Sequence, residues 1–198
     1  MLHPTPILKE SPSQTAGPYV HIGMTPNFCD ITGVCDVDLG ATMLTPDTKG
    51  ERITVSGRVF DGSGASVADA VLEIWQADAD GVFVSPPTRN SNSVPAFTGW
   101  GRQPTQSDGS FTFETIKPGR VDGPDGRPMA PHISLWIVAR GINIGLQTRL
   151  YFADEAEANA ADFVLNKILD PRRRQTLIAR REAGKVPRYV LDIILQGE

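Results

Sequence analysis

His3, His21 and His132 are the first residues to consider for chemistry, because imidazole titrates near neutral pH and is a common metal ligand. His132 stands two residues before Ser134 at the start of an apolar run, so both side chains point to the same face of an extended strand. A second histidine in place of the serine would make a plausible metal pair, but serine is a weak ligand. We therefore expect His132 to be a hydrogen-bonded structural residue.

Arg140 is the second residue with chemical potential. A guanidinium binds carboxylates in a bidentate manner and stabilises developing negative charge. Arg140 follows the apolar run 133–138 and opens a turn, so its side chain could project into a cleft. The residues alone favour an ordinary surface arginine over a functional one.

Several catalytic classes lack their motifs in this sequence. There is no Gly-x-Ser-x-Gly motif for a serine nucleophile and no glycine-rich loop to hold the phosphates of a nucleotide. Cys29 and Cys35 are too few for a disulfide framework, and no histidine or further cysteine stands near them in the spacing of a zinc site. We expect both cysteines to be reduced thiols in a loop.

Charge and hydropathy exclude two kinds of partner. The 19 basic and 23 acidic residues give a net charge of −4, so the chain has no overall positive field for nucleic acid. No apolar run reaches the roughly 20 residues that span a bilayer, and the first residues do not resemble a secretion signal. A cytoplasmic protein that binds neither nucleic acid nor membranes is predicted.

Alternating apolar residues bounded by glycine, proline and aspartate predict a mainly β protein. Two tight turns, at 61–64 and 78–81, bound the clearest pair of strands. The expected strands are residues 53–60, 70–76, 110–116, 133–138, 144–152 and 189–195. The fold class predicted is an antiparallel β-sandwich with a minor helical segment near the C-terminus.

The two ends of the chain depart from this pattern. Residues 1–50 show no sustained period and predict an extended N-terminal arm and loop that pack on another surface, before a core domain of residues 51–198. Asp170 and Pro171 form a helix start, so a short helix is expected from Pro171 to about Glu182. Its arginine clusters, 172–174 and 180–181, fit a solvated face better than a binding patch.

Six segments taken together resemble the intradiol ring-cleaving dioxygenases. They include Ser-Pro-Ser-Gln-Thr-Ala-Gly-Pro-Tyr at 11–19 and Glu-Ile-Trp-Gln-Ala-Asp at 73–78. The others are residues 115–119, 130–133, 139–144 and 149–152. The resemblance extends from about Pro12 to Gly197 and is strongest to the alpha chains of members that combine an alpha and a beta chain.

In this family a ferric ion is held by two tyrosines and two histidines on a β-sandwich core. The matching positions here are Phe83, Val121, His132 and Ser134. Only one of them, His132, is a good ligand. The resemblance therefore implies that this chain binds no metal and that Fe(III) belongs to the beta subunit of an alpha/beta enzyme.

The resemblance also implies which residues complete the partner's pocket. Those of the arm are Thr15, Gly17, Pro18 and Tyr19, and Arg140 matches a residue on the substrate side. Arg140 could orient a substrate carboxylate or stabilise charge during ring opening. The implied reaction cleaves protocatechuate with dioxygen, between the two hydroxyl-bearing carbons, to 3-carboxy-cis,cis-muconate.

Two other functions stay open at this point. A stand-alone β-sandwich module that binds an aromatic acid could keep the fold without the chemistry. A self-sufficient metalloenzyme would need ligands that the matching positions do not supply.

Overall fold

The computed structural model describes residues 15–84, 95–142 and 145–196. His3 and the motif residues 11–14 lie outside these ranges. The helices are α1 (Pro18–Met24), α2 (Ala156–Ala161) and α3 (Pro171–Gln175), with a 3-10 helix η1 (Leu165–Lys167). The strands are β1 (Arg52–Phe60), β2 (Val71–Trp75), β3 (Trp100–Pro104), β4 (Ser110–Ile116), β5 (His132–Val138), β6 (Leu146–Phe152), β7 (Ile178–Glu182), β8 (Arg188–Val190) and β9 (Ile193–Ile194).

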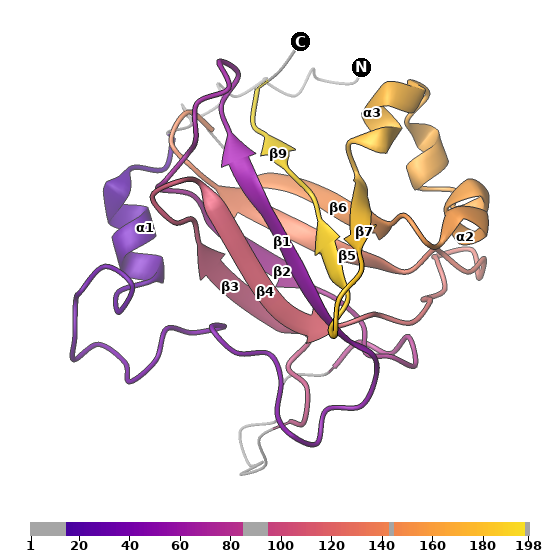
Figure 1. Ribbon diagram of the computed structural model, residues 1–198, viewed down its shortest axis with the longest axis horizontal. Coiled ribbons are helices and arrows are strands. Elements are labelled where there is room, and N and C mark those ends of the chain that lie inside the picture. Colours follow the sequence, from indigo (N-terminus) through magenta and orange to yellow (C-terminus); the bar gives the residue numbers. More distant parts are fainter. Residues whose placement is uncertain (1–14, 85–94, 143–144, 197–198) are drawn as a thin grey trace, which may run out of the picture.

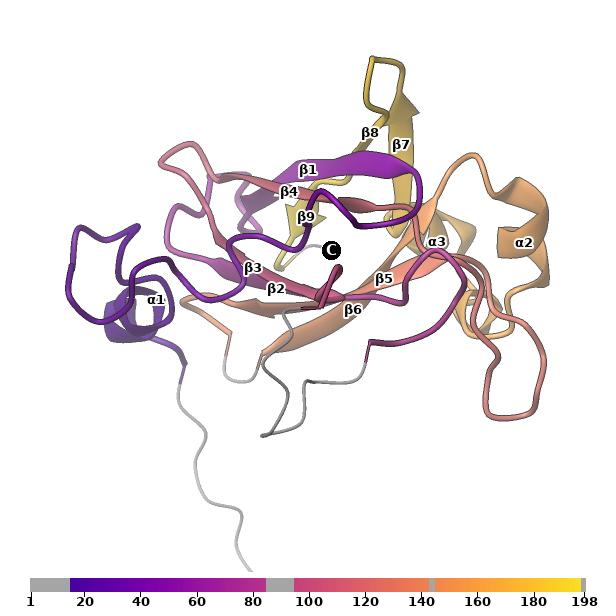
Figure 2. The same ribbon diagram turned by 90° about the horizontal axis from the view of Figure 1, so that it is seen from below.

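These strands form one bent, nearly closed sheet in the order β3-β2-β5-β6-β7-β8-β1-β4, with β9 beside β1. The layer of β1, β4 and β9 faces the layer of β2, β3, β5 and β6, and the core lies between them (Figures 1 and 2). Phe111 and Phe113 point inward from β4, while Ile74 and Leu135 point inward from the opposite layer. The predicted mainly β class is confirmed.

The sheet is mixed rather than purely antiparallel, which corrects one part of the predicted fold class. β1 pairs in parallel with β8 and with β9, and β6 pairs in parallel with β7. The remaining ladders are antiparallel. The parallel pairs arise because the chain returns to the sheet near its C-terminal end to fill the gap between β6 and β1.

The predicted helix from Pro171 to about Glu182 is wrong in its second half. Asp170 accepts a 2.8 Å hydrogen bond from the Arg172 backbone N–H and caps α3, which ends at Gln175. The chain then continues as β7, whose Ala179 is fully buried beside β6. Pairing with β6 and β8 on both sides of β7 outweighs the helix propensity of its residues. The expected last strand is also divided, into β8 and β9.

The described part of the arm, residues 15–50, is less extended than predicted. Gly17 precedes α1 and Pro18 occupies its first turn, a position where proline's missing N–H costs no helical hydrogen bond. Further along, Met43 is buried in the main core and Gly40 O accepts a 2.9 Å hydrogen bond from Arg102 N. This part of the arm is therefore anchored on its own sheet, and packing of residues 1–50 on a partner stays a prediction. None of the helices in the described residues is long enough to cross a bilayer, since the longest has seven residues.

Candidate functional site

His132 is the first residue of β5, and its side chain is buried. Its Nδ1 lies 2.8 Å from the carbonyl oxygen of Ala130. Burial lowers the pKa of His132, and the positive charge of Arg149 acts in the same direction against the opposing effects of Ala130 O and Asp162. A neutral, hydrogen-bonded imidazole is the result, in line with the structural role expected for it.

The other ligand-matching positions lie at the same end of the sheet. Trp75 on β2 is the direct partner of Ser134 on β5, and its ring centroid is 5.0 Å from that of Phe83. The backbone after β4 closes on the turn after β2, where Gly119 N donates a 2.8 Å hydrogen bond to Asp78 O. Two residues beyond Gly119 is Val121.

The close contact between the segment after β4 and the turn after β2 depends on a glycine in that turn. Gly81 has a φ of 80° and its backbone faces the Arg120 carbonyl oxygen so closely that a Cβ would collide with it. A side chain at position 81 would therefore push the segment of Val121 away from the turn that leads to Phe83.

The residues at these positions do not fit a ferric ion. Phe83 and Val121 carry no donor atom, and Ser134 is a weak ligand. Arg149 on β6 is the cross-strand partner of Ser134, so a guanidinium shares that face of the sheet and opposes a bound cation. Across the described residues, no group of three or more histidine, cysteine, aspartate or glutamate side chains is placed to hold a metal.

A hollow of about 1000 Å³ lies over this face. The ladder registers align Trp100, Trp75, Ser134 and Arg149 in one row across β3, β2, β5 and β6. Trp136 and Tyr151 extend the same face along β5 and β6. We call this feature the tryptophan hollow.

Arg140 lies at the opposite end of β5 from His132. The seven residues of β5 cover about 20 Å at 3.3 Å per residue, and Arg140 follows in the turn beyond the strand. Its Nε is 3.3 Å from Asp69 Oδ1, without the alignment of a hydrogen bond. The side chain is 67% exposed, so most of the guanidinium faces solvent.

The arm residues gather at the same end as Arg140. Burial lowers the pKa of His21 on α1, and the negative charge of Asp69 offsets this only in part. Asp69 therefore interacts electrostatically with α1 as well as with Arg140. Both views place α1 beside the end of β5 and far from α2 (Figures 1 and 2). The side chain of Tyr19 on α1 is 86% exposed. Thr15 and Gly17, just before the helix, are also exposed.

Two arrangements escaped the sequence reasoning. Cys29 Sγ lies 3.5 Å from His21 Nδ1, so the expectation that no histidine stands near the cysteines is wrong. The loop after α1 folds back on the helix, which sequence spacing does not reveal. Arg149 was also missed as a candidate, although a charged residue in a strand that is otherwise uncharged is a signal that could have found it.

Comparison with known proteins agrees with the resemblance. Residues 24–197 match the family described as dioxygenase. The protocatechuate 3,4-dioxygenase alpha chain of Pseudomonas putida is 48% identical over 98% of this chain and 96% of its own length. The protocatechuate 3,4-dioxygenase beta chain of Burkholderia cepacia is 35% identical over 75% of this chain and 66% of its own length.

The fold agrees as well. The solved structure of 3-chlorocatechol 1,2-dioxygenase from Rhodococcus opacus superposes with a TM-score of 0.62 at 23% identity, covering 83% of this chain and 67% of the other. Motifs, sequence relatives and fold thus point to the same group of enzymes. The chain belongs to the intradiol ring-cleaving dioxygenase family.

Proposed function

We propose that this chain is the alpha subunit of a heteromeric protocatechuate 3,4-dioxygenase that acts in the cytoplasm. Fe(III) resides on the partner beta subunit, and the substrates are protocatechuate and dioxygen. The names of the two relatives supply the activity and the two-chain composition. The proposal includes an arm, residues 1–50, that packs on the partner, and a β-sandwich core of residues 51–198.

One observation carries this proposal. The helix α1, which carries Tyr19, lies beside the end of β5 that leads into the Arg140 turn, while β5 begins at its far end with His132, near the other ligand-matching positions. The length of β5, about 20 Å, is too great for Arg140 to reach a substrate bound at those positions of its own chain. Residues that act on a substrate from this end must therefore act on a centre in another chain.

The chemistry of this end suits an aromatic acid. Arg140 presents a largely solvated guanidinium that can receive a carboxylate in a bidentate manner. The Asp69 carboxylate lies 3.3 Å from the Nε of Arg140, so the rest of the guanidinium stays open to a second carboxylate. Thr15, Gly17, Pro18 and Tyr19 form the neighbouring wall in this proposal, and the exposed ring of Tyr19 contributes apolar contact area to the partner's pocket. The partner's ferric ion supplies the ring-opening chemistry.

The test compares the purified chain with the same chain co-expressed beside a beta-type homologue. Iron content, visible absorbance and oxygen uptake with protocatechuate are measured for both preparations. A colourless, inactive chain that becomes part of a coloured, active complex supports the proposal. Colour and turnover in the isolated chain, or the absence of any complex, would contradict it.

A further inference from the structure

The tryptophan hollow has the wall chemistry of a site for an aromatic ring. The indoles of Trp75, Trp100 and Trp136 border it, and the Tyr151 side chain lies on the same face. Aromatic side chains stack on planar ligands in offset or edge-to-face geometries. Its volume of about 1000 Å³ is ample for a single-ring ligand with its polar substituents.

The hollow also carries an uncompensated positive charge. Arg149 Nη1 contacts only neutral atoms, Tyr151 Oη at 3.4 Å and Met129 Sδ at 3.5 Å. No carboxylate among the described residues forms an ion pair with Arg149, so its Nε and Nη2 are available to a ligand within the described part of the chain. By contrast, Glu73 in the same lining is neutralised by Arg102 at 2.6 Å.

Asp162, the carboxylate next to Tyr151, does not neutralise the charge of Arg149. Asp162 is fully buried and accepts backbone hydrogen bonds from Ala130 at 2.8 Å, Val164 at 2.9 Å and Leu165 at 2.7 Å. Its Oδ1 is 3.5 Å from Tyr151 Oη, which separates it from the guanidinium. Asp162 therefore organises the loop behind the hollow, and Arg149 faces the hollow without a counter-ion from it.

We propose that the tryptophan hollow is a second, non-catalytic binding site for a small aromatic carboxylate, with Arg149 receiving the carboxylate and the indoles contacting the ring. A bidentate guanidinium–carboxylate pair fixes the ligand's orientation, and the indole walls supply apolar contact. The site lies on β2, β3, β5 and β6 of this chain, and η1 with its neighbours completes the lining. It is distinct from the end that carries Arg140, and it requires neither iron nor the function proposed above.

The test titrates benzoate into the full-length chain and follows tryptophan fluorescence, since three tryptophans line the hollow. Saturable quenching is expected for the unchanged chain. Arg149→Gln should weaken benzoate binding at least tenfold, and Arg149→Lys should weaken it less. Arg58→Ala, which removes an exposed arginine paired with Asp108 on the other layer, is the matched control and should leave binding unchanged.

Two ligands separate charge from ring contact. Benzamide has the same ring without the charge, so its weaker binding should not respond to Arg149→Gln. Acetate has the charge without the ring and should not saturate. Benzoate that binds Arg149→Gln as tightly as the unchanged chain would overturn the proposal, provided that circular dichroism shows both folded.

A calorimetric titration of the alpha/beta complex makes the result independent of the catalytic function. Unchanged complex should bind one more benzoate per alpha chain than complex carrying Arg149→Gln. Equal stoichiometries would mean that the partner covers the hollow and would overturn the inference. An inactive preparation that still shows the Arg149-dependent site would reject the proposed function and retain this one.

Discussion

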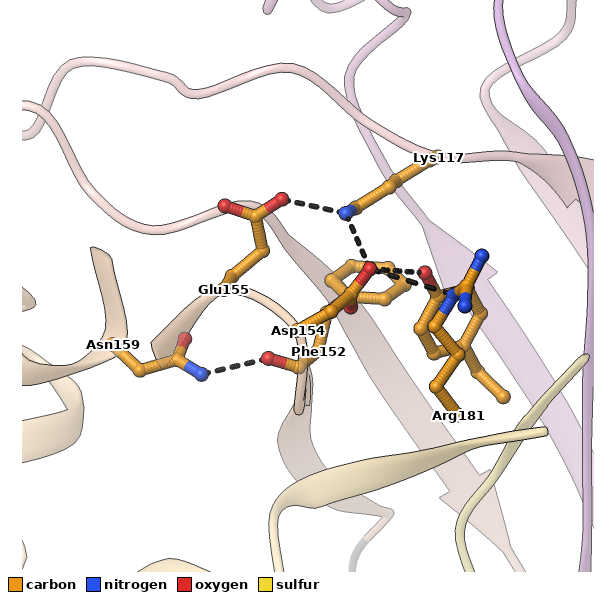
Figure 3. A network of polar contacts seen from close by, with 7 residues as sticks. Lys117, Phe152, Asp154, Glu155, Asn159 and Arg181 are labelled. Atoms are coloured by element: carbon orange, nitrogen blue, oxygen red, sulfur yellow. Dashed lines mark hydrogen bonds and ion pairs between the residues drawn. The ribbon is translucent and has the colours of Figure 1, made fainter. Parts of the chain in front are cut away.

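The Tyr189 hydroxyl donates a 2.8 Å hydrogen bond to Asp154 Oδ2, an oxygen that also lies 3.0 Å from Lys117 Nζ (Figure 3). Lys117 follows β4, Asp154 follows β6 and Tyr189 belongs to β8. Glu155 forms an ion pair with Lys117 at 2.5 Å, and Arg181 forms one with Asp154 at 3.6 Å. One carboxylate thus connects both layers of the sheet at the point where the sheet bends.

Replacing Tyr189 with phenylalanine should reduce the free energy of unfolding by about 1 kcal/mol, because the substitution removes one hydrogen bond and keeps the ring packed against Phe152. Urea denaturation measures the change. Tyr19→Phe is the matched control, since the exposed Tyr19 should alter stability by less than about 0.5 kcal/mol. Equal stabilities of the two variants would show that the Asp154 contact contributes nothing.

The same network predicts that the free energy of unfolding falls at acidic pH. Burial opposes the ionisation of Asp154, but hydrogen bonds from Tyr189 and Lys117 outweigh it and hold its pKa below the usual 3.8. A lowered carboxyl pKa contributes stability that is present above pH 3.8 and is lost as pH falls through the folded value. Asp154→Asn should therefore be less stable than the unchanged chain at pH 5, and this difference should shrink towards pH 3. A constant difference in urea midpoints across that range would contradict this assignment.

Local patterns predicted most of the strands. β4 coincides with the expected residues 110–116, because alternating residues there belong to one ladder with a buried inner face. β7 was missed because its Arg-Arg-Glu sequence has good helix propensity, and only neighbours from distant parts of the chain make it a strand. Gly101 and Pro104 gave β3 a turn-like sequence, although it pairs with all of β2.

Some of the candidate site residues could likewise be recognised from local sequence, and others could not. The family motifs singled out Arg140, His132 and Ser134 as candidates, because each matches a position in a short stretch of sequence. The tryptophan hollow depends on the register of four strands, which pairs Ser134 with both Trp75 and Arg149. Register is set by tertiary packing, so sequence spacing could not have shown that these side chains share one face.

His132 should give stability a second pH dependence, near neutral pH. Burial and the charge of Arg149 lower its pKa below 6.5, so the unfolded chain takes up a proton before the folded chain does. A lowered histidine pKa contributes stability that is complete above pH 6.5 and is lost as pH falls through the folded value, by at most about 1.4 kcal/mol per pH unit.

His132→Gln removes that contribution. We expect its free energy of unfolding to change less between pH 7 and pH 5 than that of the unchanged chain, while His21 contributes equally to both. Urea midpoints at several pH values within this interval measure the difference. Parallel pH profiles for the two proteins would mean that His132 is as easily protonated in the folded chain as in the unfolded one.

The proposed function predicts that Arg140 controls turnover of the alpha/beta complex from the subunit that does not hold the iron. Loss of a charged hydrogen bond to the substrate costs about 1.5–3 kcal/mol, so Arg140→Ala should lower kcat/KM roughly 10- to 150-fold. Arg140→Lys keeps the charge but not the planar fork and should lose less. Oxygen uptake with protocatechuate separates the two possible roles: a raised KM with steady kcat indicates carboxylate binding, and a lowered kcat indicates transition-state stabilisation. Arg58→Ala, on an exposed ion pair, is the control, and an Arg140→Ala complex with the same kcat/KM as this control would remove Arg140 from the site.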